Sequence, residues 1–277
     1  MKTFKDKVAV ITGAASGIGR GIADHCAQEG MRVVLSDVEA EALARAEKEM
    51  KSAGAKVEAV FTDVSKAGDV EELAKKTLEA FGSVDLLFNN AGVHLVGPIW
   101  ECSLKDWEWL LGVNLWGVIH GIHTFVPIML EQGTEGYIVN TASLGGLASA
   151  PNVGVYRASK HAVVTLSETL FYELAAMDAK IKVAILCPGL IQTDLLTSRR
   201  NKPVELQDKS PRKPDIPDMA KTAFWQAFEA APKPDEVAAQ VFDTLKKDEF
   251  YILTHPEQTK TMVSKRLEDI LSGRNPT

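Results

Sequence analysis

Tyr156 and Lys160 stand four residues apart in the stretch VYRASK, just before an apolar run with helical spacing. Side chains four residues apart share one face of a helix, so the phenol and the ammonium group can meet. A free phenol titrates near ~10 and exchanges protons at neutral pH only where its phenolate is stabilised. The Lys160 charge is expected to lower the Tyr156 pKa, which makes the pair a candidate general acid and base for an alcohol. In a chain with 4 tyrosines such a spacing can also arise by chance, so support is needed from elsewhere.

A glycine-rich loop supplies the first support. The segment TGAASGIG, residues 12–19, follows a short β-branched run and leads into a helical pattern. Gly13, Gly17 and Gly19 would let the backbone turn tightly and approach a pyrophosphate placed on the helix N-terminus. The spacing is G-x-x-x-G-x-G and not the commoner G-x-G-x-x-G, and a purely structural glycine turn is the alternative.

An acidic residue at the end of the second predicted strand adds weight. Asp37 lies eighteen residues beyond Gly19, where the Rossmann pattern places an acid for the adenosine ribose hydroxyls. Its charge would repel a 2′-phosphate. With Val38 instead of arginine after it, and Ser16 instead of a basic residue in the glycine loop, the sequence favours NAD over NADP. The alternative for Asp37 is a cap for the helical run that begins at Val38.

Alternating strand and helix patterns must position these residues. Most of the strand-like runs are continuously apolar, as in parallel strands covered on both faces. The pattern predicts an α/β fold, a doubly wound parallel seven-stranded sheet with helices on both faces. The predicted strands are 7–12, 32–36, 57–61, 84–88, 137–141, 182–186 and 250–253, and the predicted helices include 39–53, 67–81, 104–130 and 156–176.

Nothing in the sequence divides the chain, so residues 1–277 are interpreted as a single domain. Residues 198–218 interrupt the alternation with four prolines and mixed charge. We interpret them as part of a mobile substrate lid at about 195–230 and not as a basic patch for nucleic acid.

The composition narrows the function classes. Formal charge is 31 − 37 = −6 with a pI near 5.6, which gives no attraction for nucleic acid or an anionic membrane. Cys26, Cys102 and Cys187 are far apart, and they match neither a disulfide framework nor a metal site. With no secretory apolar region at the N-terminus, a cytoplasmic location is expected. Residues 109–130 carry no charged side chain, but their polar and glycine positions favour a buried helix over a membrane span.

Taken together, the motifs resemble those of the short-chain dehydrogenase/reductase family, a family of NAD(P)-binding Rossmann-fold oxidoreductases. The resemblance runs from the first strand to about Thr193, and the motifs occur in the family's order and at its spacings. They are TGAASGIG, Asp37, Asp63-Val64, NNAG at 89–92, Asn114, Ser143, Tyr156-x-x-x-Lys160 and PGLIQT at 188–193.

The resemblance implies a role for each matching position. It implies a catalytic set of Asn114, Ser143, Tyr156 and Lys160. Ser143 would stabilise charge on the substrate oxygen, although a strand-end cap is its alternative. Asn114 would hold a water behind the lysine, although a buried amide paired with main chain is its alternative. The implied NAD-binding residues are Gly13, Ser16, Gly17, Ile18, Gly19, Asp37, Asp63, Val64, Asn90, Ala91, Gly92, Tyr156, Lys160, Pro188, Gly189, Ile191 and Thr193.

The substrate is encoded where the resemblance is weakest, after Thr193. The candidate walls lean apolar, which favours a small hydrophobic secondary alcohol or ketone of steroid, aryl or alicyclic type. His94 is a candidate for binding a polar group of the substrate, but a lone histidine in a loop is more often a surface residue. The candidate walls are His94, Leu95, Leu144, Gly145, Val153, Leu190, Leu195, Phe224 and Trp225.

The sequence also bears on assembly and on two alternative activities. Apolar residues on more than one stripe of 156–176 predict a second buried face, hence a homodimer or homotetramer. A 3-oxoacyl-carrier-protein-type ketoreductase is an alternative activity, disfavoured because such enzymes usually look built for NADP. A non-catalytic dinucleotide sensor is another, which loss of Tyr156 or Lys160 would have favoured.

Overall fold

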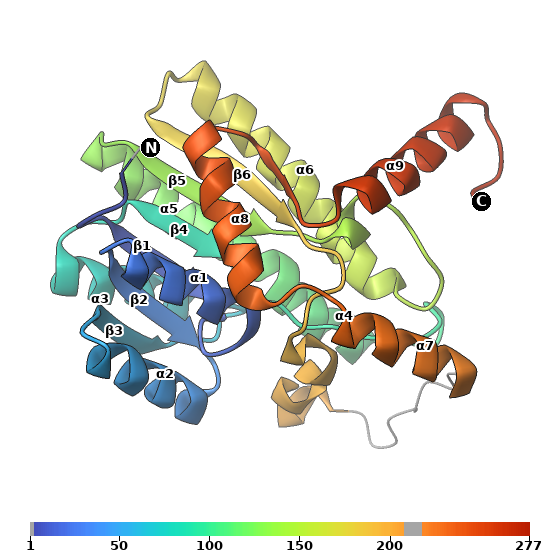
Figure 1. Cartoon of the computed structure of the whole chain (residues 1–277), viewed down its shortest axis with the longest axis horizontal. Coiled ribbons are helices and arrows are strands. Elements are labelled where there is room, and N and C mark those ends of the chain that lie inside the picture. The colour runs from blue at the N-terminus through green and yellow to red at the C-terminus, as the bar shows by residue number, and fades with distance from the viewer. Residues whose placement is uncertain (1–2, 208–217) are drawn as a thin grey trace.

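The structure, a computed structural model, describes residues 3–207 and 218–277. Its described residues include a seven-stranded parallel sheet, as the sequence predicts (Figure 1). The strand order is β3-β2-β1-β4-β5-β6-β7. The strands are β1 (Val8–Thr12), β2 (Arg32–Asp37), β3 (Lys56–Phe61), β4 (Leu86–Asn89), β5 (Gly136–Thr141), β6 (Ile181–Cys187) and β7 (Tyr251–Leu253). The α-helices are α1 (Gly17–Gln28), α2 (Ala40–Ser52), α3 (Ala67–Phe81), α4 (Leu104–Leu111), α5 (Gly117–Gln132), α6 (Gly154–Ala176), α7 (Asp218–Glu229), α8 (Pro234–Lys247) and α9 (Pro256–Leu271).

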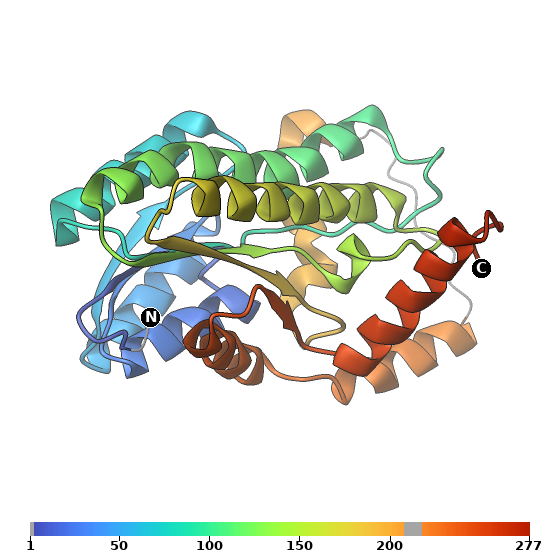
Figure 2. The same cartoon turned by 90° about the horizontal axis from the view of Figure 1, so that it is seen from above.

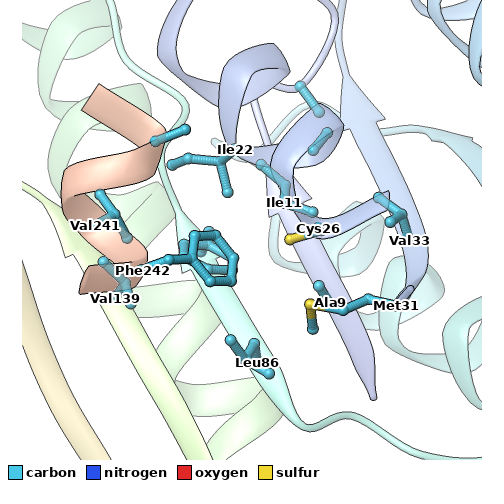
Figure 3. Close-up of a cluster of buried hydrophobic side chains, with 14 of the residues drawn as sticks. Ala9, Ile11, Ile22, Cys26, Met31, Val33, Leu86, Val139, Val241 and Phe242 are labelled. Carbon is cyan, nitrogen blue, oxygen red and sulfur yellow. The ribbon is translucent and has the colours of Figure 1, made fainter. Parts of the chain in front are cut away.

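The strands are apolar along their whole length because helices cover both faces of the sheet. Within β1, Ala9 and Ile11 face one helical layer, and Val10 faces the other. The first layer contains α1, α2 and α8, and the second contains α3, α5 and α6. Figure 2 separates these layers, and Figure 3 shows Phe242 of α8 packed beside Ile22 of α1 over the sheet.

The order of the strands reverses next to β1. The chain runs from β1 outward to β3 and then returns to β4, so β1 pairs with both β2 and β4. The connections that leave the carboxyl ends of β1 and β4 therefore depart in opposite directions. In open α/β sheets this point forms the crevice where ligands bind.

The predicted helix 104–130 is interrupted in the structure. A five-residue π-helix, Gly112–Trp116, separates α4 from α5 and contains the buried Asn114. Such π-segments are often found at functional sites. By length and composition, Leu104–Gln132 is the one described helical stretch that could cross a membrane, and 39% of its apolar window is buried. Since core helices pass the same test, this is weak evidence for a span.

The other predicted elements match observed ones to within two residues at each end. The lid region is described in part: two 3₁₀ helices, Asp194–Asn201 and Val204–Leu206, and then α7. Residues 208–217, which include three of the four prolines of the segment 198–218, lie outside the described residues. The single-domain interpretation stays a prediction.

Candidate active site

A cavity of about 600 Å³ lies where the strand order reverses, beyond the carboxyl ends of the central strands. Among the residues predicted to bind NAD, all but Gly19 line it. Ser143, Tyr156 and Lys160 line it too, and Asn114 does not. The structure therefore brings segments between residues 13 and 193 to one cavity.

The glycine loop leaves no room for side chains. Gly13 and Gly17 have φ of +66° and +54°, a region that side-chain-bearing residues rarely adopt. A Cβ on Gly19 would lie 2.1 Å from the Gly13 carbonyl oxygen. Because α1 begins at Gly17 with no acidic residue in its first turn, its N-terminus suits an anion. The loop is thus shaped as a phosphate cradle that a side chain would fill, which fits the dinucleotide implied by the sequence.

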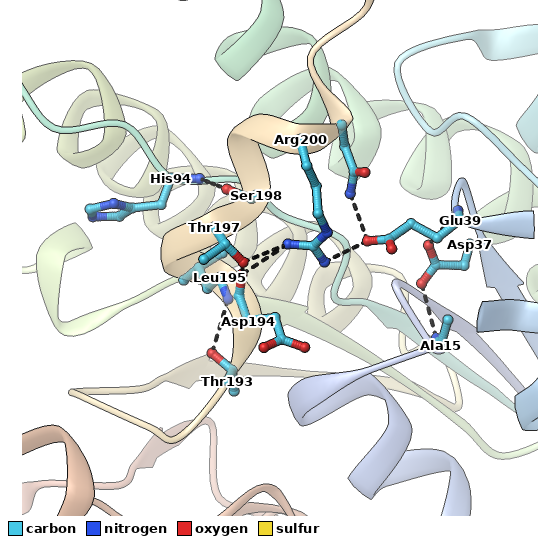
Figure 4. A network of polar contacts seen from close by, with 11 residues as sticks. Ala15, Asp37, Glu39, His94, Thr193, Asp194, Leu195, Thr197, Ser198 and Arg200 are labelled. Carbon is cyan, nitrogen blue, oxygen red and sulfur yellow. Dashed lines mark hydrogen bonds and ion pairs between the residues drawn. The ribbon is translucent and has the colours of Figure 1, made fainter. Parts of the chain in front are cut away.

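Asp37 ends β2 and holds the glycine loop. Its carboxylate accepts hydrogen bonds from the backbone N–H of Ala15 at 2.9 Å and of Glu39 at 3.0 Å (Figure 4). Burial raises the Asp37 pKa, and these backbone donors oppose the shift. Helix α2 begins at Ala40 and has no side-chain cap, so the bond to Glu39 closes a turn before the helix and is not the cap expected as the alternative. The bond to Ala15 places the acid at the cofactor loop.

Thr12 was missed as a site residue in the sequence, although it opens the glycine motif. Its hydroxyl accepts hydrogen bonds from the backbone N–H of Asn90 at 2.9 Å and of Ala91 at 3.0 Å. The Asn90 amide in turn donates to the Thr12 carbonyl at 3.0 Å. These bonds join the loops after β1 and β4 across the reversal of the sheet. A threonine directly before the first glycine was the available signal.

Tyr156 and Lys160 share the inner face of α6, as their spacing predicts. Lys160 Nζ lies 5.8 Å from the centroid of the Tyr156 ring and donates to the Thr141 carbonyl at 2.8 Å. The Ser143 hydroxyl accepts from the Gly145 N–H at 3.0 Å and reaches the Pro188 carbonyl at 3.4 Å. Its capping contact is therefore present, and the hydroxyl also faces the cavity beside the phenol.

In the protein by itself the net shift of the Tyr156 pKa is upward, against the downward shift expected from Lys160. Burial raises the Tyr156 pKa, and it outweighs a hydrogen bond with Ser143 and the charge of Arg157, which both lower it. Burial also lowers the pKa of Lys160 to about 8, since the charged ammonium is penalised in the interior. The protein alone thus favours a neutral phenol, and a further positive charge is needed to stabilise the phenolate.

The Asn114 side chain is hydrogen-bonded to main chain, as expected if it is a buried structural amide. Its side-chain oxygen accepts from the Val93 N–H at 2.8 Å, and its nitrogen donates to the Val93 carbonyl at 2.9 Å and to Ser159 at 3.2 Å. These bonds fix the loop after β4 to the π-helix. The predicted water-holding role stays a prediction, and the observed bonds show that Asn114 positions that loop.

The remaining cofactor candidates lie on loops after β3 and β6. The Asp63 carboxylate is bound by Ser65 through its backbone N–H at 3.1 Å and its hydroxyl at 2.7 Å. Gly189 packs so closely on the His255 ring that a Cβ would lie 2.5 Å from it. Thr193 accepts a bond from Leu195 N–H at 3.4 Å and starts the 3₁₀ helix.

A strap, residues 194–206, crosses the cavity and was not predicted in detail. Arg200 pairs with Glu39 at 2.6 Å, and Asn201 donates to the same carboxylate at 2.8 Å (Figure 4). Ser198 accepts from the backbone N–H of His94 at 2.8 Å. The Lys202 ammonium, with its side chain 2% exposed, binds Asp106 at 2.7 Å. The strap is therefore tied to both ends of the cavity.

The predicted substrate walls are only partly observed. Leu95 is buried away from the cavity lining, and Phe224 and Trp225 lie on α7, 38% and 52% exposed, where they pack on each other and on Phe228. The described residues contain no cluster of three or more side chains that could hold a metal. The candidates that do line the cavity are His94, Leu144, Gly145, Val153, Leu190 and Leu195.

Comparisons with known proteins agree with this geometry. The family model for short chain dehydrogenases matches residues 7–204. A CLA biosynthesis dehydrogenase/reductase of Lactiplantibacillus plantarum is 37% identical, over 100% of this chain and 97% of its own. An (S)-acetoin-forming diacetyl reductase of Staphylococcus epidermidis is 37% identical over 73% of this chain and 78% of its own.

Solved structures agree as well. A short-chain dehydrogenase/reductase from Burkholderia phymatum, solved in complex with NAD, superimposes with a TM-score of 0.93 at 44% identity. The match covers 100% of this chain and 98% of that one. With its parallel sheet, glycine cradle and Tyr156–Lys160 pair, this chain belongs to the short-chain dehydrogenase/reductase family.

Proposed function

We propose that the protein transfers a hydride between NAD and a hydrophobic secondary alcohol or the matching ketone. The observation that carries this proposal is the convergence of Ser143, Tyr156 and Lys160 on the cavity that also holds the glycine cradle and Asp37. A proton-transfer set and a dinucleotide cradle on one cavity suit alcohol oxidation and ketone reduction.

In the proposed reaction Tyr156 moves the proton. During oxidation the phenolate takes the alcohol proton, and during reduction the phenol returns it. The nicotinamide, when bound, accepts or supplies the hydride, and its positive charge in the oxidised form is the further charge that the phenolate needs. Ser143 donates to the substrate oxygen and gives up its long 3.4 Å contact with Pro188 to do so. Lys160, held by Thr141, is placed to hydrogen-bond the nicotinamide ribose.

Two observations support NAD over NADP as the partner. Asp37 lines the cavity with a half-buried carboxylate, where a 2′-phosphate would meet a like charge. The related Burkholderia phymatum structure holds NAD. The apolar walls Leu144, Val153, Leu190 and Leu195 support a hydrophobic substrate.

The testing experiment follows absorbance at the reduced-nicotinamide band. A panel of hydrophobic secondary alcohols, including steroid, aryl, alicyclic and short aliphatic types, is offered with NAD and then with NADP. We expect turnover with NAD for at least one class. No turnover across the panel, together with tight NADH binding, would contradict the proposal and favour a dinucleotide sensor.

The carrier-protein ketoreductase is less well supported. An acidic carrier needs exposed basic side chains near the cavity mouth, but the strap's cations face acids of this chain: Arg200 binds Glu39, and Lys202 binds Asp106. Any basic residues in 208–217 lie outside the described residues. An activity assay that compares reduction of a 3-oxoacyl carrier protein with reduction of the free 3-oxoacyl thioester would test this alternative. Only a carrier-protein ketoreductase is expected to prefer the protein-bound form.

A homodimer or homotetramer is part of the proposal. On α6, Phe171 and Tyr172 contact each other and are 42% and 70% exposed, apolar surface that a twin subunit would cover. Light scattering that gives a strict monomer would contradict it. The free cysteines, of which Cys26 and Cys187 are buried, fit the proposed cytoplasmic location.

A further inference from the structure

His94 is not the surface residue that its loop position suggests. Its ring centroid lies 4.6 Å from that of Tyr156, with the two rings tilted by 59°, and it lines the cavity. Its backbone N–H is held by Ser198 of the strap, and Figure 4 shows its imidazole pointing away from that contact. The ring is therefore placed beside the proton-transfer residue by a fixed main chain.

The imidazole has unused hydrogen-bonding capacity. No hydrogen bond to either ring nitrogen of His94 comes from the part of the chain that the structure describes. Burial and, to a smaller extent, the nearby charge of Arg157 lower the His94 pKa to about 4. The ring is thus neutral near pH 7, with one nitrogen that donates and one that accepts.

Beside His94, the cavity is also lined by Arg157, whose guanidinium donates to the Ala148 carbonyl. Leu144, Val153 and Leu195 are apolar, and the Ser143 hydroxyl is directed at the reacting oxygen in the proposed mechanism. A substrate that fills the cavity displaces water from the half-buried His94 ring, and a polar group cut off from water without a partner costs free energy. A substrate that supplies a partner for His94 would remove that cost, and a purely hydrocarbon substrate would not.

We propose that His94 is a specificity residue that binds a second oxygen of the substrate, on the carbon next to the reacting one. The inference rests on the proposed function, in which Tyr156 holds the reacting oxygen. Rings in contact at 4.6 Å place the imidazole within reach of a substituent one or two bonds from that oxygen. The preferred class is then vicinal diketones, α-hydroxyketones and vicinal diols.

A neutral imidazole suits both directions of the reaction. Its N–H donates to the second oxygen when that oxygen is a carbonyl, and its bare nitrogen accepts when the oxygen is a hydroxyl. An ammonium or a cationic imidazole could donate to either oxygen, but it could not accept the hydrogen bond of a hydroxyl. The positive charge of Arg157, which lines the same cavity, disfavours substrates with a cationic substituent at this position.

The test compares ketones in matched pairs that differ only by an adjacent carbonyl, such as 2-butanone with 2,3-butanedione and cyclohexanone with 1,2-cyclohexanedione. The measured quantity is the ratio of kcat/KM within each pair, with NADH as reductant. His94→Phe keeps a ring but removes the hydrogen bond, and His94→Asn keeps a donor and an acceptor. His123→Phe makes the same exchange at an exposed position of α5 and serves as the control.

We expect the native protein to prefer the diketone in at least one pair, and His94→Phe to lower that ratio roughly tenfold or more. His94→Asn should keep the ratio within a few-fold, and His123→Phe should not change it. NADH affinity should be the same in all three variants.

An equal ratio in the native protein and His94→Phe would overturn the inference, as would a native preference for the plain ketone in every pair. Failure of the proposed function looks different. In that case neither the pairs nor the alcohol panel shows turnover with NAD or NADP, and the inference falls with it.

Discussion

The two halves of the cavity are built by different means. The dinucleotide half is shaped mainly by backbone: Gly13 and Gly17 with positive φ, and Gly19 in contact with the Gly13 carbonyl. The substrate half is shaped by side chains on the loop after β4 and on the strap, with His94 and Leu195 as examples. Backbone geometry admits few residue types, whereas a side-chain wall admits many.

This difference explains which half can be altered without loss of the fold. A change in the glycine loop must displace main chain, and main chain is held by the sheet on one side and α1 on the other. A change at His94 or Leu195 alters a surface that faces open space. We therefore expect mutations in the first half to abolish cofactor binding, and those in the second to redirect specificity.

The largest effect is expected where the two halves meet, at Tyr156. Tyr156→Phe removes the proton donor but keeps the ring, so kcat should fall by ~10³-fold or more, at the upper part of the range for general acid–base catalysis. NADH binding, measured by fluorescence titration, should stay within a few-fold. Tyr172→Phe, at a 70% exposed position on the same helix, is the control. A native rate in Tyr156→Phe would refute the proposed mechanism.

A slightly smaller effect is expected in the dinucleotide half. In Gly19→Ala the new Cβ would lie 2.1 Å from the Gly13 carbonyl oxygen, so the loop must shift and the cradle is lost. We expect NADH affinity to fall by ~100-fold, since about 3 kcal/mol of overpacking strain converts to that factor. Gly68→Ala, where a Cβ meets nothing within 4 Å, should leave affinity and melting temperature nearly unchanged. Equal affinities in the two variants would show that the loop adapts.

The sequence predicted the dinucleotide half of the cavity better than the substrate half. The parallel sheet, the alternation of strands with helices and the glycine cradle were predictable. Continuous apolar strands and obligatory glycines leave a pattern in the sequence. Thr12 and Asn114 act through main chain, and their contacts required coordinates.

The substrate half was predicted less well. Trp225 was placed in the wall because it is large and apolar, but packing on Phe228 keeps it on α7 away from the lining. His94 was ranked as a surface residue because loop position alone does not show that a neighbouring helix brings Tyr156 against it. Long-range contacts between loops have no local period in the sequence, so pattern analysis does not reach them.

A moderate effect is expected at Asp37, which separates cofactor choice from cofactor binding. Asp37→Ala removes the charge that would repel a 2′-phosphate, and the preference for NAD over NADP should narrow by about tenfold, equivalent to about 1.4 kcal/mol. The readout is the ratio of kcat/KM for the two cofactors. Asp24→Ala, on the exposed side of α1, is a matched loss of charge. If the preference stayed unchanged, Asp37 would serve only to hold Ala15 and Glu39.

The smallest effect tests whether the strap joins the two halves. Glu39 is bound by both Arg200 and Asn201, so Glu39→Gln should loosen the strap at its adenosine end while Ser198 still holds the His94 loop. Because the Glu39 and Arg200 side chains are 30% and 38% exposed, solvent screens the pair, and its loss should cost at most about 1 kcal/mol.

That cost corresponds to a rise of a few-fold in the NADH dissociation rate, measured by stopped-flow displacement. Glu41→Gln, whose side chain is 97% exposed in the first turn of the same helix, is the control. A strap that acts on the cofactor half alone would leave the diketone preference unchanged in Glu39→Gln. A change in that preference would show instead that the loss of the Glu39 contact alters the position of His94 through Ser198. The two halves of the cavity would then not be independent.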